Sequence, residues 1–281
     1  MKIVFTFIIL FCSISGSYAQ KGWNQDYSRK NQFFGHWGYN VSGYSNSDIS
    51  FVGQDYNFTL YDVQATDRPT PFDWDTYFNP GTISIPQWNL RFGYFISNRW
   101  SLSIGTDHMK YVMVQDQYVA MEGYINIENG SHNGAYNRQA KKLTDDFLKF
   151  EHTDGLNYAS VEAEYHGNIY QFNEKHSIDY YIGPGIGLLV PRSNVTLMEF
   201  PRYDAFHLAG FGMSAKMGIQ AILWKHLTFN AEWKNGFISM QDILTTGKSP
   251  NDRSMQNFWF TEFTGTIGFI MDFTKKTKKI E

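Results

Sequence analysis

The segment Phe258–Phe273 constrains the fold of this chain more than any other. Every second residue from Phe263 to Phe273 is apolar or glycine, whereas the alternate positions include Glu262, Thr264, Thr266, Gly268 and Asp272. Successive side chains of a β-strand point to opposite faces, so one face needs an apolar environment and the other a polar one. An aromatic residue ends the pattern. These features predict a membrane-spanning β-strand.

The amino terminus has the pattern of a secretory signal peptide, Met1–Ala19. Lys2 supplies a positive end, Ile3–Ile14 an apolar core, and small residues precede the predicted cut. The mature chain would then begin at Gln20 and lack cysteine, because Cys12 is the only one. A membrane anchor and a lipid attached at Cys12 are the alternatives. The short apolar run and the bulky residue before Cys12 disfavour them.

The composition narrows the class of protein. Aromatic and charged residues each make up 18% of the chain, an unusual balance for a soluble domain. The formal net charge of −3 provides no basic field for nucleic acid. Beyond the amino terminus no segment is apolar for about 18 residues, the length that predicts a membrane helix. A secreted chain of this kind is either a soluble all-β protein or an outer-membrane barrel.

Three pairs of alternating segments are joined by short connections and predict β-hairpins. The pairs are Ile85–Ile96 with Trp100–Met113, Tyr158–Phe172 with Ser177–Val190, and His207–Leu223 with Leu227–Ile238. Long polar stretches separate the pairs. Outer-membrane barrels have short periplasmic turns and longer outer loops, so the tight turns are expected to face the periplasm.

The final strand follows a long outer loop, so it runs toward the periplasm. Ile85–Ile96 precedes a tight turn, so it runs toward the periplasm too. A strand running outward must therefore precede Ile85–Ile96, and Phe33–Val41 supplies it. We therefore predict an all-β fold: a transmembrane antiparallel up-and-down barrel of about eight strands. A ten-stranded barrel, in which Tyr56–Ala65 also crosses the membrane, is the alternative. We interpret Tyr56–Ala65 as a β-ribbon above the membrane, and Tyr118–Ile127 as a similar extension.

The predicted organisation has four parts. They are a signal peptide (1–19), a periplasmic amino-terminal segment (20–31), the barrel (32–274) with extracellular loops 42–84, 114–157, 191–206 and 239–257, and a periplasmic tail (275–281).

The two faces of the predicted strands carry different side chains. Aromatic residues near strand ends are expected at the membrane interfaces: Trp37, Trp88, Tyr94, Trp100, Trp224, Trp233 and Phe273. Inward positions predict a lumen charge network: Arg91, Asp107, Glu162, Glu164, His166, Lys216, Glu232, Lys234, Glu262 and Asp272, with Asp179 on the same face. An eight-stranded barrel has room only for its own side chains, so we predict a closed lumen, with a gated pore as the alternative.

One conflict of register remains in the segment Trp100–Met113. Strict alternation puts His108 and Lys110 on the same face as Leu102 and Ile104. A β-bulge, or emergence from the membrane before His108, would remove the conflict.

The sequence offers little support for catalysis. It has no phosphate loop, no zinc-protease motif and no nucleophile elbow. The glycines of Gly183–Gly187 are better explained by crowding in a barrel wall than by a dinucleotide site. Asp107 and His108 point to opposite faces and are poorly placed for one metal ion. His166 with Glu162 and Glu164 is the best candidate for an acid/base cluster, but a buried ion-pair network explains these residues better.

Some small barrels deacylate lipid A with a His-x-Ser pair. Here Gly167 and Asn168 follow His166, and Leu208 and Ala209 follow His207, so the pair is absent. We predict no catalytic residue, no metal site and no cofactor. The outer segment Asp67–Phe72 has the prolines and aromatics of a shaped loop, which would either bind a partner or fold over the barrel mouth.

Several motifs resemble poorly characterised outer-membrane β-barrel proteins of Bacteroidota. They are Phe34–Asn40, Ser47–Ile49, Phe58–Leu60, Asp67–Pro69, Gly93–Phe95 and Asp107–Tyr111. The architecture is also similar to small OmpA, OmpX and OmpW type barrels. The resemblance implies outer-membrane residence and a porin-like fold, and it assigns no catalytic role. The chain departs from the usual pattern because eight residues follow Phe273.

The functional hypothesis is a non-enzymatic outer-membrane barrel with a structural or interaction role through its outer loops. Its expected partners are outer-membrane lipid and an envelope or surface protein, and not nucleic acid. A channel for small solutes or apolar ligands is the first alternative, and a lipid-modifying enzyme is the second.

Overall fold

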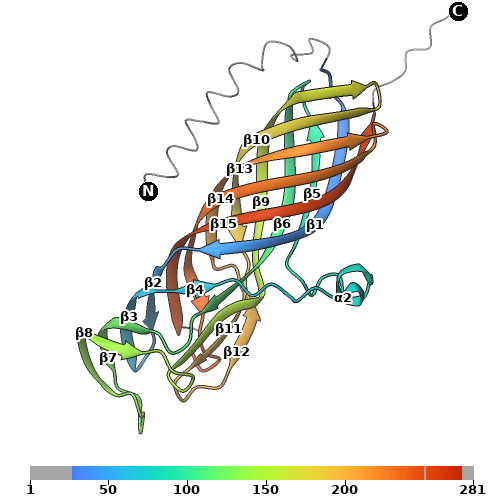
Figure 1. The fold of residues 1–281 in the computed structure, drawn as a ribbon. Helices are drawn as coiled ribbons and strands as arrows, with labels where there is room; N and C mark the ends of the chain where they lie inside the picture. The colour runs from blue at the N-terminus through green and yellow to red at the C-terminus, as the bar shows by residue number, and fades with distance from the viewer. Residues whose placement is uncertain (1–26, 250, 274–281) are drawn as a thin grey trace, which may run out of the picture.

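The computed structural model describes residues 27–249 and 251–273. The predicted signal peptide, most of segment 20–31 and the predicted tail lie outside the described residues. Strands dominate the fold, and the short helix α2 (Trp74–Phe78) projects from its side (Figure 1). In the described part of the chain, no helix has both the length and the apolar character needed to span a bilayer.

Eight antiparallel strands form a closed ring in the order β1-β5-β6-β9-β10-β13-β14-β15, and β15 pairs with β1 to close it. The ring strands are β1 (Gln32–Tyr44), β5 (Trp88–Phe95), β6 (Trp100–Met113), β9 (Leu148–Asn173), β10 (His176–Leu189), β13 (Gly210–Leu223), β14 (Leu227–Leu244) and β15 (Arg253–Asp272). Each predicted hairpin is present. The prediction of an eight-stranded up-and-down barrel is confirmed, and the ten-stranded alternative is wrong.

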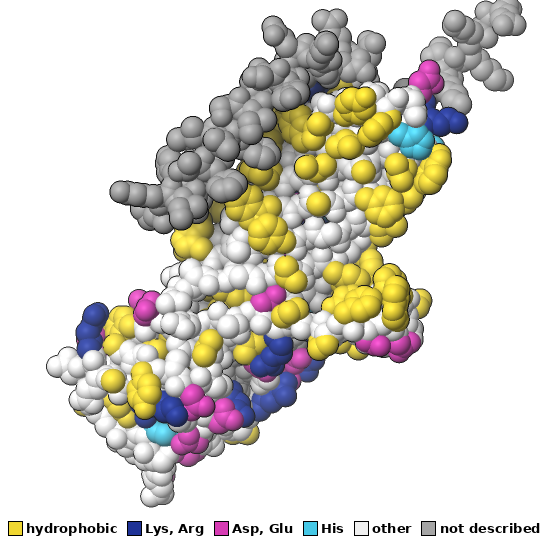
Figure 2. All heavy atoms as spheres, in the orientation of Figure 1, with side chains coloured by type: hydrophobic (Ala, Val, Ile, Leu, Met, Phe, Trp, Pro, Cys, Tyr) yellow, Lys and Arg dark blue, Asp and Glu magenta, His cyan; other side chains and the backbone are white. Residues whose placement is uncertain are grey.

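The outward face of the ring is an apolar belt (Figure 2). Its exposed side chains include Phe92, Leu102, Ile104, Val161, Ile182, Ile186, Leu188, Phe211, Met213, Met217, Ile219, Phe229, Phe263, Ile267, Phe269 and Met271. So much contiguous exposed apolar surface would be unstable in water but suits hydrocarbon. The ring closes every strand edge, as a bilayer requires. The fold is that of an outer-membrane β-barrel.

The ends of the ring opposite the tight turns continue into a second region, which we call the headpiece (Figure 1). It contains the outer ends of β6, β9, β14 and β15 together with β2 (Ser47–Val52), β3 (Tyr56–Val63), β4 (Ala65–Thr66), β7 (Tyr118–Ile125), β8 (Gly134–Lys142), β11 (Arg192–Leu197) and β12 (Tyr203–Phe206). β2 pairs with β15, and β3, β7 and β8 follow in order. On the other side β11 pairs with β9 and β12.

The headpiece has its own hydrophobic core, which the prediction of polar outer loops missed. Its buried members include Ile49, Phe51, Tyr56, Phe58, Leu60, Met113, Met121, Phe147, Leu148, Phe150, Val195, Leu197, Met240, Ile243 and Phe258. Phe51 meets Phe150 edge-on at 5.8 Å between ring centroids, and Phe58 lies 5.9 Å from Phe147. These contacts join the β2–β3 side of the headpiece to the β9 side.

The headpiece explains why several strands are longer than predicted. β9 begins at Leu148 instead of Tyr158, β14 runs to Leu244, and β15 begins at Arg253. Beyond the apolar belt, the extension of β9 pairs with β11, that of β15 pairs with β2, and those of β14 and β15 pair with each other. The interpretation of Tyr56–Ala65 and Tyr118–Ile127 as ribbons agrees with β3 and β7, which pair with each other outside the ring.

The conflict of register at Lys110 is not resolved by a bulge in β6. The pairing with β9 shifts between Met109 and Tyr111, but the extra residues lie in β9. β6 itself keeps alternating, with Met109, Tyr111 and Met113 buried, so Lys110 stays on the outward face. The Lys110 ammonium donates to Thr70 Oγ1 at 3.0 Å and to the Ile85 carbonyl at 3.0 Å, both in the segment that carries α2. That segment therefore covers the charge on the outer face of β6.

Replacing Phe58 with Ala should loosen the headpiece and leave the barrel intact. Phe58 is fully buried and stacks on Phe51 at 5.0 Å, so the cavity should cost about 3–5 kcal/mol. Hydrogen exchange should show faster exchange of β3 and β7 amides with no change in β10 and β13. The exposed Tyr118→Ala is the matched control. Equal exchange in both variants would contradict an independent headpiece core.

Candidate functional site

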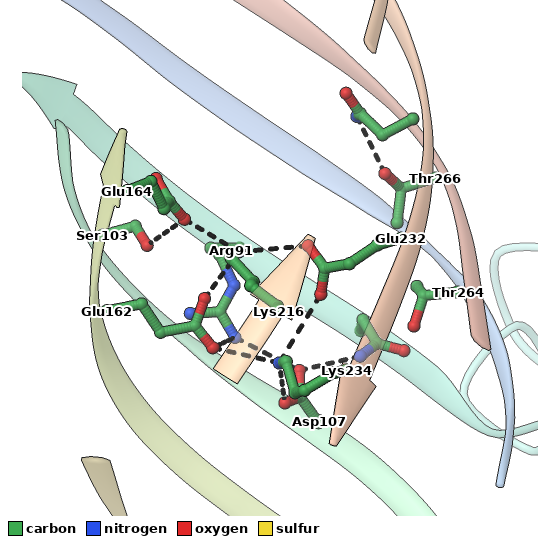
Figure 3. Close-up of polar contacts among 12 residues, drawn as sticks. Arg91, Ser103, Asp107, Glu162, Glu164, Lys216, Glu232, Lys234, Thr264 and Thr266 are labelled. Atoms are coloured by element: carbon green, nitrogen blue, oxygen red, sulfur yellow. Dashed lines mark hydrogen bonds and ion pairs between the residues drawn. The ribbon is translucent and has the colours of Figure 1, made fainter. Parts of the chain in front are cut away.

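The inward faces of the ring strands converge on the lumen charge network (Figure 3). Because side chains alternate along each strand, Glu162, Glu164 and His166 of β9 share one face. They meet Arg91 from β5 and, from the other strands, Asp107, Lys216, Glu232 and Lys234. Glu262 joins the network through Asn89, which donates to both Asp107 and Glu262. All of these side chains are buried. The network spans the barrel from wall to wall.

Arg91 and Lys234 make one half of the lumen charge network. The Arg91 Nη2 atom lies 3.2 Å from Asp107 Oδ1 and 3.0 Å from Glu162 Oε1. Lys234 Nζ contacts Asp107 Oδ2 and lies 3.0 Å from Glu162 Oε1. Asn89 donates to Asp107 Oδ1 at 2.7 Å. Asp107 is thus held by Arg91 and Lys234, and both cations also contact Glu162.

Lys216 makes the other half of the network. Its Nζ lies 2.6 Å from Glu162 Oε2, 2.8 Å from Glu164 Oε1 and 3.1 Å from Glu232 Oε2. Ser103 also donates to Glu164 Oε1, at 2.8 Å. Since Glu162 contacts all three cations of the network, it links the two halves.

The prediction that Asp272 belongs to the network is wrong. Asp272 is the last residue of β15 and is exposed at the tight-turn end of the barrel. Glu262 is buried on the same strand and accepts hydrogen bonds from Asn89 and, at 3.0 Å, from Thr264. Alternation alone put Asp272 and Glu262 on one face, but Asp272 lies beyond the enclosed part of the lumen.

A second ion pair closes the tight-turn end of the lumen. Arg29 Nη1 lies 2.8 Å from Asp179 Oδ2, and Tyr27 donates to the same carboxylate at 3.0 Å. The Arg29 guanidinium also lies 4.6 Å from the centre of the Phe95 ring. Sequence reasoning missed Arg29 because it precedes the first strand and belongs to no alternating pattern.

Apolar layers lie on both sides of the lumen charge network. Toward the tight turns, Phe34, Phe95, Ile222 and Ile270 form a small buried cluster. Toward the headpiece, Tyr158 and Phe260 begin the large core described above. Ion pairs, apolar side chains and the headpiece core thus follow one another along the barrel axis, and the arrangement closes the lumen at several levels.

Ser101, His166 and Glu164 superficially resemble a catalytic triad. His166 Nε2 lies 2.9 Å from Ser101 Oγ, but Glu164 Oε2 approaches that same nitrogen, at 3.6 Å, and also accepts from Ser101 at 2.5 Å. In a working triad the carboxylate orients the imidazole through the opposite ring nitrogen. All three residues are buried. The geometry is that of a structural hydrogen-bond cluster.

The other residues singled out in the sequence have structural positions. Gly183–Gly187 lies within β10, and a Cβ on Gly185 would come within 2.8 Å of Glu162 Cγ and of Ser214 Oγ. This glycine makes room for the network. Within residues 27–249 and 251–273, no group of three or more His, Cys, Asp or Glu side chains has the arrangement of a metal site.

The predicted interface aromatics occupy several levels of the wall. Tyr94, Trp100, Trp224 and Phe273 are exposed near the tight turns. Trp88 stacks on His108 near the other end, with 5.5 Å between centroids. Trp37 pairs with Leu90 and Ile267, and Trp233 with Met217 and Phe263. These apolar neighbours put Trp37 and Trp233 within the apolar belt.

No protein-family model matches the sequence, and no curated protein matches it. The similar solved structures include three bacterial proteins. OprG, an outer membrane protein of Pseudomonas aeruginosa, is 12% identical, with a TM-score of 0.42 over 87% of this chain and 98% of that one. Neisserial surface protein A is 11% identical, with a TM-score of 0.36 over 85% of this chain and 97% of that one. Ail of Yersinia pestis is 10% identical, with a TM-score of 0.34 over 86% of this chain and 99% of that one. These values transfer no activity, ligand or partner to this chain.

Lys216→Met should destabilise the barrel strongly. It leaves Glu162, Glu164 and Glu232 buried and facing one another, and breaking a buried ion network costs about 3–5 kcal/mol. Guanidinium unfolding in phospholipid vesicles measures the change. Lys225→Met, in an exposed tight turn, is the control and should stay within about 0.5 kcal/mol. Equal midpoints would show that the network does not support the fold.

Acid should weaken the headpiece through His152. Burial lowers the pKa of His152 from near 6.5 to about 4, and its Nδ1 lies 2.8 Å from Ser193 Oγ. Between these values the unfolded chain binds a proton that the folded headpiece does not. Stability therefore falls as pH drops from about 6.5 to about 4, by up to about 3 kcal/mol.

Limited proteolysis of the headpiece across this pH range measures the effect of His152. His152→Gln should flatten the pH dependence, whereas His176→Gln, at a tight turn remote from the headpiece, should not. An unchanged slope in His152→Gln would assign the acid sensitivity to another group.

Proposed function

We propose that this protein is a non-enzymatic, non-conducting outer-membrane barrel that anchors the headpiece, and that the headpiece binds an envelope or surface protein. The observation that carries the proposal is the closure of the lumen by the Arg29–Asp179 pair, the lumen charge network and the headpiece core. Because the lumen is filled, the headpiece is the region that can bind another molecule. We place it outside the cell, because short turns face the periplasm in bacterial barrels.

The headpiece offers a defined surface for such a partner. Among the described residues, β8 pairs only with β7 and β12 only with β11, so both strands leave an open edge of the sheet. An open edge can accept a strand from another protein. Arg138, Lys141 and Lys142 lie along β8, and charged edge residues discourage uncontrolled pairing. The formal net charge of −3 supports a protein partner over nucleic acid.

The two alternatives have less support. A channel would need the ion pairs of Glu162 to open, and an enzyme would need access to the buried Ser101 and His166. Membership of the Bacteroidota barrel family rests on the motifs quoted above, such as Asp107–Tyr111, and is part of the proposal.

Copurification from native membranes tests the proposal. Tagged wild-type protein should bring down a stoichiometric partner, and Asn137→Glu with Ala140→Glu should weaken its recovery several-fold. Both residues are exposed on β8, so the added charge should affect the edge while the core stays intact. The control is Glu174→Lys, in an exposed tight turn.

Planar bilayers provide the complementary measurement. The purified barrel should leave the bilayer at its baseline conductance, because the lumen charge network and the apolar layers close it. Steady channels, together with repeated absence of a stoichiometric partner, would defeat the anchor function and favour the channel alternative. A partner retained equally by the β8 variant and by the control would move the binding surface away from β8.

A further inference from the structure

Residues 67–87, which we call the arm, leave the wall of the barrel sideways at the level where the apolar belt meets the headpiece (Figure 1). The arm carries α2, whose amino terminus is capped by Asp73, which accepts from the Thr76 amide at 3.0 Å. The side chains of Phe72, Trp74 and Phe78 are 64%, 70% and 63% exposed. Exposed aromatic clusters of this kind on a small element indicate an interaction surface.

These aromatic side chains form one continuous patch. Phe72 lies 5.3 Å from Trp74, and Trp74 stacks on Phe78 at 5.1 Å between ring centroids. Trp74 and Phe78 are four residues apart in α2, so they lie on the same face of the helix. We call Phe72, Trp74 and Phe78 the aromatic patch.

The arm is amphipathic in a direction that matches the barrel. Asp73 and Asp75 are its exposed acidic residues. Figure 2 shows the apolar side chains of the arm on the side toward the apolar belt and the acidic ones on the opposite side. Around an upright barrel, the apolar side of the arm therefore faces the membrane and the acidic side faces water.

The arm is attached firmly to the outer face of the barrel. Tyr39 of β1 donates to the Tyr77 carbonyl at 2.5 Å, and its ring meets the Tyr77 ring edge-on at 4.7 Å. Tyr77 donates in turn to the Thr70 carbonyl at 2.6 Å. A hollow of about 280 Å³ lies between arm and wall, lined by Tyr39, Val41, Pro69, Thr70, Tyr77, Gln87 and Phe263 among others.

We infer that the aromatic patch is seated in the interfacial layer of the lipid leaflet on the headpiece side, so that the arm anchors the headpiece to the membrane surface. The occupant of this surface is lipid, because the patch is continuous with a lipid-facing wall: Val41 and Phe263 belong both to the apolar belt and to the hollow under the arm. Aromatic residues on an amphipathic element with a polar outer side are the composition that membrane interfaces favour.

The position of the arm affects how the barrel can tilt in the membrane. It lies against β1 on one side of the barrel, and Lys110 ties its base to β6. An interfacial contact on one side resists tilting of the barrel in that direction. The arm thus fixes the angle at which the headpiece stands on the membrane.

Site-directed spin labelling in phosphatidylcholine nanodiscs holding one copy of the barrel tests this inference. Cys12 is the only cysteine of the chain, so a Cys12→Ser background carries a single label. Labels at Trp74→Cys should collide several-fold more with oxygen, relative to a water-soluble nickel chelate, than labels at Asp75→Cys, the adjacent residue on the acidic side. Tyr118→Cys, exposed on the headpiece, should resemble Asp75→Cys. Heat-modifiable migration on gels verifies that each variant is folded.

Each outcome decides the inference. Protection of position 74 with exposure of positions 75 and 118 in one-copy discs supports the lipid contact, since such a disc holds no second copy of the barrel and no envelope partner. Equal exposure of all three positions to the nickel chelate overturns it. Protection of position 74 only in discs with two copies also overturns it, and assigns the aromatic patch to a contact between copies. None of these outcomes depends on whether the headpiece binds a protein partner.

Discussion

The charged side chains inside the barrel must neutralise one another, because the wall around them faces hydrocarbon. Glu162 illustrates the constraint: it contacts Arg91, Lys216 and Lys234, which come from three different strands. These contacts require the strands to keep one register. A slip of one residue would turn the charges outward, and each Lys or Arg at the middle of the bilayer would cost about 2–4 kcal/mol. The network therefore specifies the register of the ring as well as filling it.

The same network supports the proposal that the protein acts through its headpiece and not through its lumen. Buried ion pairs are expensive to desolvate, and well-packed apolar side chains of equal volume often stabilise a protein better. The ion pairs instead fix the relative positions of the strands, and their side chains fill the space that a channel would need. Apolar layers at Phe95 and Phe260 lie on either side of the network. If the ion pairs separated to open the lumen, the charged groups would therefore face apolar side chains that cannot replace their partners. Closure is thus built into the order of layers along the axis.

The strand number was predictable because two local signals are strong from Ile85 onward. These are the alternation of apolar and polar residues along each strand and the length of the connections between strands. Most of the lumen charge network was predictable for the same reason. Arg29 was not, since it lies outside any strand, and Asp272 was wrongly included because alternation says nothing about where enclosure ends. The headpiece core was missed since Leu148, Val195 and Ile243 are scattered among polar residues. Their burial comes from pairing between segments distant in the sequence.

The continuity of the long strands determines how the headpiece meets its surroundings. β9 passes as one strand from Leu148 in the headpiece to Asn173 at a tight turn, and β14 and β15 likewise extend from the ring into the headpiece. A headpiece built on these strands inherits the orientation of the barrel and cannot move as a free loop does. Under the proposed function, a partner would meet a headpiece surface that is already ordered by folding. Little conformational entropy would then be lost on binding, which favours affinity. In the proposed function, rigid attachment through the strands and the inferred lipid contact of the arm act together to present β8 at one angle to the membrane.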